Sequence, residues 1–152
     1  MGVKIKINAI DKRDIPMYQS DGAAGFDLYA SHSMQDPIGV FPGMWALIPT
    51  GIRVEIPVGY EMQVRSRSGL SLKKGIFVMN SPGTIDSDYR GEIGVILFNA
   101  SQSRFTIQPG DRIAQGVLSK VYIAEFEDGE LSDSTRSDRG FGSTGKIGRA
   151  HV

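Results

Sequence analysis

The sequence predicts an all-β fold, a jelly-roll-like barrel of short strands with one short helix and a flexible C-terminal arm. The 19 glycines and 7 prolines are spread along the whole chain and interrupt it every few residues. The runs between them are short and rich in Val, Ile, Phe and Tyr, and several alternate between apolar and polar residues. Short strands at regular spacing, separated by turn residues, are typical of all-β barrels and sandwiches.

The predicted strands follow one another as far as about residue 126. Residues 3–10 alternate strictly (Val-Lys-Ile-Lys-Ile-Asn-Ala-Ile), and so does the run Ile52–Ile56, which indicates half-buried strands. A segment around Ala24–Ala30 fits an ordinary strand. Further apolar runs bounded by turn residues are Met44–Pro49, Tyr60–Arg65, Ile76–Met79, Glu92–Asn99, Phe105–Ile107 and Ile113–Phe126.

One helical segment interrupts the strands. Ser68–Gly75 reads Ser-Gly-Leu-Ser-Leu-Lys-Lys-Gly, with Ser68 placed to cap its start and Gly75 placed to end it. After about Glu127 the composition turns polar and rich in Gly and Ser, as in mobile chain ends. The sequence therefore predicts a β-barrel domain over residues 1–130 and a C-terminal arm over residues 131–152.

Composition excludes several classes of function. Lys and Arg together number 17, as do Asp and Glu, so no net charge draws the chain toward nucleic acid or membrane. There is no cysteine, which excludes thiol catalysis and Cys-ligated zinc and fits an intracellular protein. Only two histidines occur, so a multi-His metal site is not expected. No apolar run approaches the roughly 20 residues that span a bilayer, and no signal-like N-terminus precedes the first strand.

The segment from Asn80 to Gly94 is the most informative stretch. It predicts a β-hairpin, because turn residues separate the apolar runs 75–79 and 93–98. The turn region carries two carboxylates, Asp86 and Asp88, and the aromatic Tyr89. This combination suits a ligand pocket. A carboxylate can take a proton, exposed backbone groups can bind a flat polar ring, and an aromatic side chain can pack on a sugar. A plain connecting hairpin is the alternative interpretation.

Two other segments invite a phosphate-binding interpretation. Arg65–Leu70 places guanidinium, hydroxyl and backbone amides at the start of the helix, where phosphates bind readily, although a capped basic turn explains it as well. Residues 140–146 (Gly-Phe-Gly-Ser-Thr-Gly-Lys) match parts of the dinucleotide-binding and P-loop patterns. Both patterns require a following helix, and only six residues follow Lys146, so neither applies. The lone Phe141 in this arm indicates docking on a flat surface.

Taken together, five segments resemble the five motifs of the trimeric deoxyuridine triphosphatases in order and approximate spacing. They are Ala24–Ala30, Arg67–Leu70, Gly83–Gly91, Gly110–Gln115, and Arg136 with Gly140–Gly145. The resemblance covers nearly the whole chain, and its third motif, Gly-Thr-Ile-Asp-Ser-Asp-Tyr-Arg-Gly, is highly specific. Ser66 departs from the family, in which many members have Pro, and so does the pair Ser137-Asp138, where Gly is more usual.

The resemblance implies cleavage of dUTP between its α and β phosphates, which gives dUMP and pyrophosphate. Asp86 would be the general base that orients and deprotonates the attacking water. The implied cofactor is Mg²⁺ on the three phosphates, with Asp27 contacting it through a bound water. The phosphate chain would be bound by Arg67, Ser68, Gly69, Gln115, Arg136 for the γ-phosphate, Ser143 and Thr144.

The family also implies how the nucleoside is recognised. Backbone groups around Asn80, Gly83, Thr84, Ile85 and Gly94 would bind uracil in a strand pair too narrow for the 5-methyl of thymine. Tyr89 would lie under the deoxyribose, and Phe141, with Gly142 beside it, would stack on the base as the arm closes. The implied assembly is a homotrimer that shares its active sites between subunits, so that a single chain is inactive.

Two alternatives stay open at this point. A dCTP deaminase-related enzyme has the same fold but uses a Glu for chemistry on the base, whereas this chain has Asp86, Tyr89 and the complete glycine arm. A dUTPase with an added regulatory, protein-binding role is the second, because some phage proteins of this fold regulate partners. The expected partners are dUTP and two further copies of the chain, without nucleic acid or membrane. The expected location is cytoplasmic, or nuclear for a eukaryotic or viral source.

Overall fold

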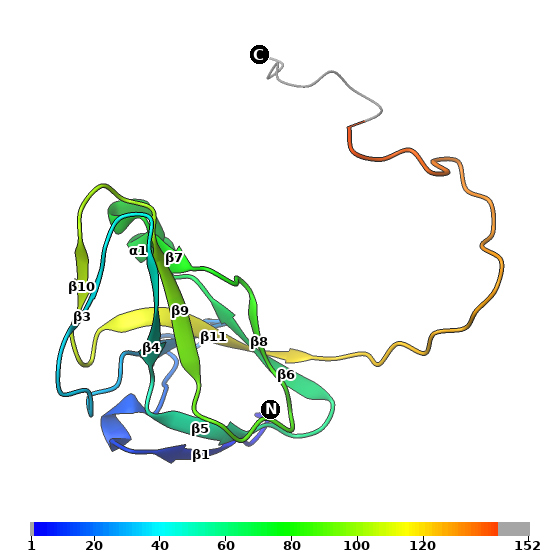
Figure 1. Cartoon of the computed structure of the whole chain (residues 1–152). Helices are drawn as coiled ribbons and strands as arrows, with labels where there is room; N and C mark the ends of the chain where they lie inside the picture. The colour runs from blue at the N-terminus through cyan, green and yellow to red at the C-terminus, as the bar shows by residue number, and fades with distance from the viewer. Residues whose placement is uncertain (1, 143–152) are drawn as a thin grey trace. The chain divides into compact units, whose positions relative to one another are not determined.

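The computed structural model describes residues 2–142, and their regular structure consists almost entirely of short strands (Figure 1). The contacts divide the chain into two units, Met1–Tyr122 and Ile123–Val152, which are treated separately. All regular elements of the described residues lie in the first unit: β1 (Lys6–Ala9), the 3₁₀ helix η1 (Lys12–Asp14), β2 (Phe26–Tyr29), β3 (Ile38–Val40), β4 (Trp45–Pro49), β5 (Ile52–Glu55), β6 (Tyr60–Arg65), α1 (Ser68–Lys74), β7 (Ile76–Val78), β8 (Gly83–Ile85), β9 (Gly94–Asn99), β10 (Phe105–Ile107) and β11 (Arg112–Lys120).

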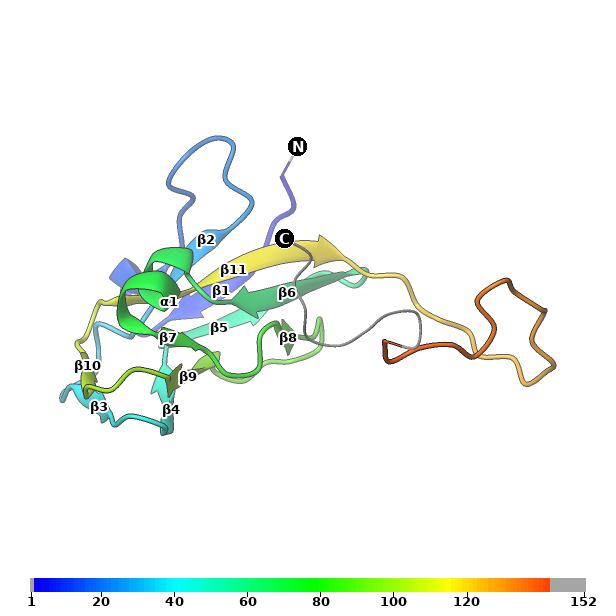
Figure 2. The ribbon, with the colours of Figure 1, turned by 90° about the horizontal axis from the view of Figure 1, so that it is seen from above.

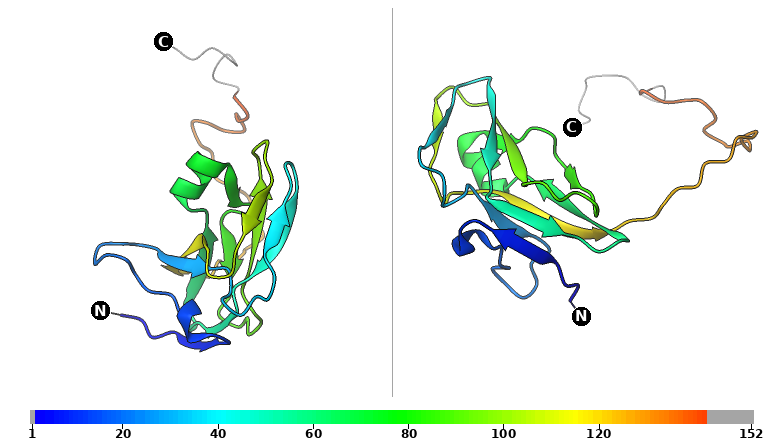
Figure 3. Two further views of the ribbon diagram at one scale, coloured as in Figure 1. Left: turned by 90° about the vertical axis from the view of Figure 1, so that its left-hand side faces the viewer. Right: turned by 60° about the horizontal axis from the view of Figure 1, so that its bottom comes forward.

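The strands form four antiparallel sheets. The largest has the order β2-β11-β6-β8, and a three-stranded sheet has the order β4-β9-β7. Two further pairs complete the set, β1 with β5 and β3 with β10. Figure 1 shows β4 and β9 running across the direction of β11, and Figure 3 shows β3 and β10 side by side at one end of the unit. The all-β prediction is therefore confirmed.

One apolar core joins these sheets. On β9, Val95 and Leu97 point inward while Ile96 and Phe98 are only half-buried, as a period of two requires. Leu28 on β2, Ile48 on β4 and the inward residues of β9 all belong to the same buried cluster. The sheets that carry the candidate site are thus packed against each other through a shared interior, which holds the strand ends in place.

Residues 2–142 form four separate sheets and no closed barrel, which corrects the barrel part of the prediction. Most strands pair over only three to six residues, so the hydrogen-bonded ladders end before the sheets join. The predicted strand from Ile113 to Phe126 is also too long, because β11 ends at Lys120. The side chains of Tyr122, Ile123 and Phe126 beyond it are almost fully exposed and pack on no core. The apolar residues after Lys120 made the predicted strand longer than the strand that forms.

The short helix is confirmed, but its start differs from the prediction. Arg67, in an extended conformation, is the N-cap and makes no capping hydrogen bond through its side chain, so Ser68 is the first helical residue and not the cap. Gly75 ends the helix in the left-handed region with φ of 67°, as predicted. Figure 2 shows α1 beside β7, to which a single residue, Gly75, connects it. Arg67 therefore lies in the short connection between the end of β6 at Arg65 and the start of α1 at Ser68.

The predicted hairpin is only partly correct. Its arms do pair, with Ile76 opposite Asn99 and Val78 opposite Leu97. The connection between them is not a simple turn, however, because β8 leaves the three-stranded sheet and pairs with β6 in the other sheet. β8 was not predicted as a strand, since three residues are too few to show a period. Its pairing places the segment after Ile85 between the two sheets.

The second unit contains no strand or helix among residues 123–142. Its local order comes from turns: the Arg136 Nε donates to the carbonyl of Arg139 at 2.6 Å, and the Arg139 Nη2 donates to the carbonyl of Thr135 at 2.8 Å. Phe141 is fully exposed. Across residues 2–142, no helix is both long and apolar enough to cross a membrane.

Candidate active site

A groove of about 540 Å³ lies where β4, β8 and β9 meet. Five of the residues predicted as site residues line it, namely Thr84, Ile85, Asp86, Tyr89 and Gly94. They come together because β8 ends at Ile85 and β9 begins at Gly94, so that the connection between these strands forms one wall. The remaining lining residues are Leu47, Pro49, Glu92 and Ile96.

The wall between β8 and β9 is held by its own hydrogen bonds. The Tyr89 hydroxyl donates to the carbonyl oxygen of Glu92 at 2.8 Å, and the Tyr89 amide donates to the carbonyl of Asp86 at 3.2 Å. The Tyr89 ring lies so close to Gly91 that a Cβ there would be 2.4 Å from the hydroxyl oxygen. Asp86 itself is exposed at the end of β8. The turn therefore presents a fixed aromatic ring and an accessible carboxylate to the same groove.

Leu47 and Gly94 set the width of the groove. Pro49 pairs with Gly94 and Leu47 with Ile96 across the β4–β9 ladder. A Cβ at Gly94 would lie 2.6 Å from Leu47 Cδ1, so the Leu47 side chain would have to move to admit a side chain there. Leu47 was not predicted as a site residue, and only knowledge of this strand pairing would have found it. Its exposed side chain adds an apolar surface to the groove.

Asn80 and Gly83 lie at the start of β8 and outside the lining of the groove. Gly83 is buried, and a Cβ on it would be 3.4 Å from both the Asn80 Nδ2 and the Val64 Cβ. The two residues therefore pack against each other where β8 meets β6. Of the predicted uracil-binding set, the structure brings Thr84, Ile85 and Gly94 to the groove and leaves Asn80 and Gly83 behind it.

A second group of charged residues surrounds Asp27 on β2. Its carboxylate contacts the Nε of Arg67 at 3.3 Å and the Nη1 of Arg112 at 3.5 Å, and the Arg67 Nη1 donates to the carbonyl of Arg112 at 3.1 Å. Arg112 was not predicted. Two guanidinium groups around one half-buried carboxylate leave an excess of positive charge, which suits a polyanion.

Gln115 joins this group from β11. It lies opposite Asp27 in the β2–β11 ladder, and its Nε2 donates to the carbonyl of Ser66 at 2.9 Å. Ser66, the departure from the family pattern, accepts a hydrogen bond from the Val78 amide through its hydroxyl at 2.9 Å. A proline has no hydroxyl, so here the serine supplies an additional tie between the residue before Arg67 and β7. Ser68 and Gly69 follow in the first turn of α1.

The predicted site residues therefore fall into three groups. The first group lines the groove and the second surrounds Asp27 with Arg67 and Gln115. Among the described residues, the two groups share no member. Arg136, Phe141 and Gly142 belong to the second unit, and Ser143 and Thr144 lie outside the described residues. Within residues 2–142, no cluster of three or more His, Cys, Asp or Glu side chains could hold a metal ion.

Comparisons with known proteins agree on one family. The model of the dUTPase family matches residues 11–145. A deoxyuridine 5'-triphosphate nucleotidohydrolase of Chlamydia pneumoniae is 58% identical over 134 residues, which is 87% of this chain and 91% of the relative. One from Helicobacter pylori (strain ATCC 700392 / 26695) is 51% identical over 145 residues, 94% of this chain and 97% of the relative. The solved dUTPase of Staphylococcus bacteriophage 80alpha with dUpNHpp has a TM-score of 0.81 at 25% identity, covering 94% of this chain and 99% of that one.

Proposed function

This chain belongs to the dUTPase family, and we propose that it cleaves dUTP between the α and β phosphates through the groove, the Asp27 group and the C-terminal arm acting together. It is a hydrolase of the dUTP diphosphatase kind. The observation that carries the proposed mechanism is the groove itself, because Asp86 and Tyr89 line the same space as the backbone of Ile85 and Gly94. A nucleoside bound there meets a carboxylate, an aromatic ring and the facing ends of two strands.

The groove is the proposed nucleoside site. Uracil is a flat ring with donors and acceptors along its edge, and the backbone of Thr84, Ile85 and Gly94, which line the groove, would bind it. Leu47 lies over Gly94 and offers an apolar contact to the base. Tyr89 packs under the deoxyribose, where a 2′-hydroxyl would meet the ring. Asn80 and Gly83 support the nucleoside site indirectly, because they pack where β8 meets β6.

Asp86 is the proposed general base. It is exposed at the end of β8, it lines the groove, and its neighbour Tyr89 is held by two hydrogen bonds in the same turn. A carboxylate in this place can accept a proton from a water that attacks the α-phosphorus, while the pyrophosphate leaves on the opposite side. The reaction then consumes one water and yields dUMP and pyrophosphate.

The Asp27 group is the proposed phosphate site. Arg67 and the first-turn amides of Ser68 and Gly69 face the phosphates, and Gln115 contacts the phosphate chain. The group fits a Mg²⁺ that arrives on the triphosphate, because it combines one carboxylate, Asp27, with the guanidinium groups of Arg67 and Arg112. When bound, Mg²⁺ would supply positive charge to the phosphate oxygens, and Asp27 would be the residue that holds it, through water.

A homotrimer is the proposed assembly. The groove and the Asp27 group share no lining residue in the first unit, which supports a site formed by the groove of one subunit and the phosphate site of another. A third chain contributes the arm: Arg136 to the γ-phosphate, Phe141 and Gly142 over the base, and Ser143 and Thr144 on the phosphates. A single chain then has all the parts but no complete site.

Nucleotide turnover tests the proposed function most directly. The purified chain with Mg²⁺ is supplied in parallel with dUTP, dCTP, dTTP and UTP, and released pyrophosphate and ammonia are measured. We expect rapid pyrophosphate release from dUTP alone. Ammonia from dCTP would identify the deaminase chemistry instead, and equal turnover of UTP would contradict the proposed role of Tyr89.

Replacing Phe141 tests the arm. Phe141→Ala removes the proposed stacking on uracil, which is worth about 1–3 kcal/mol for base–aromatic contacts, so kcat/KM for dUTP should fall by roughly 5- to 150-fold. The melting temperature should stay the same, because Phe141 is fully exposed and packs on no core. Leu131→Ala, an equally exposed apolar side chain of the same unit, is the matched control and should leave kcat/KM near that of the wild type. A lower melting temperature with normal turnover would contradict this role.

A further inference from the structure

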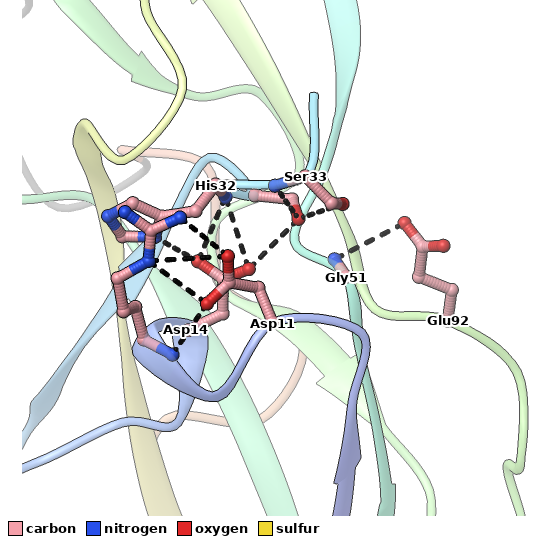
Figure 4. A network of polar contacts seen from close by, with 8 residues as sticks. Asp11, Asp14, His32, Ser33, Gly51 and Glu92 are labelled. Atoms are coloured by element: carbon pink, nitrogen blue, oxygen red, sulfur yellow. Dashed lines mark hydrogen bonds and ion pairs between the residues drawn. The ribbon is translucent and has the colours of Figure 1, made fainter. Parts of the chain in front are cut away.

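A buried carboxylate lies apart from the groups described above. Asp14, at the end of η1, has its side chain completely removed from solvent. It accepts hydrogen bonds from the Ser31 hydroxyl at 2.9 Å and from the His32 backbone amide at 3.1 Å, and it pairs with the His32 Nδ1 at 2.6 Å (Figure 4). Burying a carboxylate is costly unless such partners surround it. Because Asp14 contacts both the backbone amide and the Nδ1 of His32, it holds the His32 ring in one orientation.

The other side of the His32 ring faces the turn before β11. A Cβ on Gly110 would lie 2.6 Å from the His32 Nε2, so the ring edge rests directly on the backbone of this glycine. Gly110 has a φ of 85°, in the left-handed region. Its amide donates to the carbonyl of Ala30 at 2.7 Å, and the Ala30 amide donates to the carbonyl of Asp111 at 2.7 Å. Asp14 and His32 therefore support this turn from outside the strand ladder.

The turn leads directly into the phosphate site. Arg112 follows it, contacts Asp27 through its Nη1 at 3.5 Å, and accepts a hydrogen bond from Arg67 through its carbonyl oxygen at 3.1 Å. The β2–β11 ladder shifts register between Arg112 and Ala114. Arg112 is still paired with Tyr29 in this ladder, but the irregularity follows directly after it, so the preceding turn is a second constraint on where its backbone lies.

We propose that Asp14 and His32 are positioning residues for the triphosphate: they hold the Gly110 turn so that Arg112 keeps Arg67 and Asp27 in the geometry that receives the phosphates. This rests on the proposed function of the Asp27 group. The contacts of the His32 ring run toward the Gly110 turn, whereas Ser31, another partner of Asp14, donates its amide to the carbonyl of the groove residue Pro49 at 2.9 Å. His32→Asn is therefore the variant that separates the phosphate site from the groove.

A neighbouring pair on the same segment provides the matched control. Arg13 contacts Asp11 through its Nη2 at 2.7 Å and through its backbone amide at 2.9 Å, but this pair is exposed and does not touch His32 through any hydrogen bond among the described residues. The Arg13 side chain and amide hold the pKa of the Asp11 carboxyl at about 2, below its usual value. Asp11→Asn removes a charge three residues before Asp14 and leaves the hydrogen bonds of the Gly110 turn in place.

The test compares a ligand with phosphates and one without. Wild type, Asp14→Asn, His32→Asn and Asp11→Asn are purified as full chains, and KM and kcat for dUTP are measured beside the inhibition constant of deoxyuridine. An asparagine at position 32 still offers an amide donor near the place of Nδ1 but lacks the ring atoms that rest on Gly110. We expect KM for dUTP to rise about tenfold in Asp14→Asn and His32→Asn, the size of one lost hydrogen bond to a charged group. The inhibition constant of deoxyuridine should not change in His32→Asn, and the kinetics of Asp11→Asn should match those of the wild type.

The outcomes separate this inference from the proposed function. If wild type does not turn over dUTP, the proposed function fails. If wild type is active and both variants behave like Asp11→Asn, the positioning role is wrong, and equal weakening of dUTP and deoxyuridine would show a general structural role instead. Should Asp14→Asn not fold, the milder His32→Asn, at a partly exposed ring, decides the question by the same comparison.

Discussion

Asp86→Asn should lower kcat for dUTP by about 10²- to 10⁴-fold, the usual contribution of a positioned general base, while dUTP still binds. The amide keeps the size of the carboxylate and its place at the end of β8 but cannot accept the proton of the attacking water. Binding should persist because the groove walls, Leu47, Tyr89 and Gly94 among them, are unaffected. Single-turnover kinetics measure the chemical step, and calorimetry with a non-hydrolysable dUTP analogue and Mg²⁺ measures binding.

Asp88 offers a control within the same turn. It lies two residues after Asp86 but is not among the residues that line the groove. Asp88→Asn should therefore turn over dUTP at nearly the wild-type rate. A rate near wild type for Asp86→Asn, or an equal loss in both variants, would show that the base lies elsewhere or that the charge of the turn acts as a whole.

Two inactive chains should restore activity when they assemble together. One carries Asp86→Asn, and the other ends after Glu130 and so lacks Arg136 and Phe141. Each homotrimer alone should be nearly inactive. In a mixed trimer, however, the intact Asp86 of the truncated chain can meet the intact arm of the other. With random assembly from equal amounts, about a quarter of the sites combine both intact parts when these come from different subunits.

The mixing experiment has a direct control and a clear contrary result. A chain with both changes, mixed with the Asp86→Asn chain, should regain nothing, because no intact Asp86 is present. The chains are refolded together so that the subunits redistribute, and sedimentation measures the size of the assembly. Failure of the mixture to regain activity in trimers of confirmed mixed composition would show that the arm acts on its own subunit. A fully active monomer would overturn the shared site altogether.

Several features followed from local sequence alone. The alternation of β5 sends Ile52 and Val54 inward and leaves Arg53 and Glu55 exposed, and Gly75 ends the helix, because both features depend on residues only a few positions apart. The adjacency of Thr84, Ile85 and Asp86 in the chain also made them neighbours in the groove. Periodicity, capping and short motifs are properties of a segment, so they can be recognised without the rest of the molecule.

Other features were decided only by contacts between distant segments. Leu47 belongs to the groove because β4 pairs with β9, and Arg112 reaches Asp27 because a bulged strand pairs with β2.

The end of β11 at Lys120 has the same kind of cause, since the apolar residues that follow, such as Tyr122 and Phe126, find no neighbouring strand or core among the described residues. Strand pairing is chosen by burial across the whole core and not by the local residues. The sequence by itself therefore determined the family, the strand class and the motif residues, whereas the tertiary structure decided which of these residues share a site.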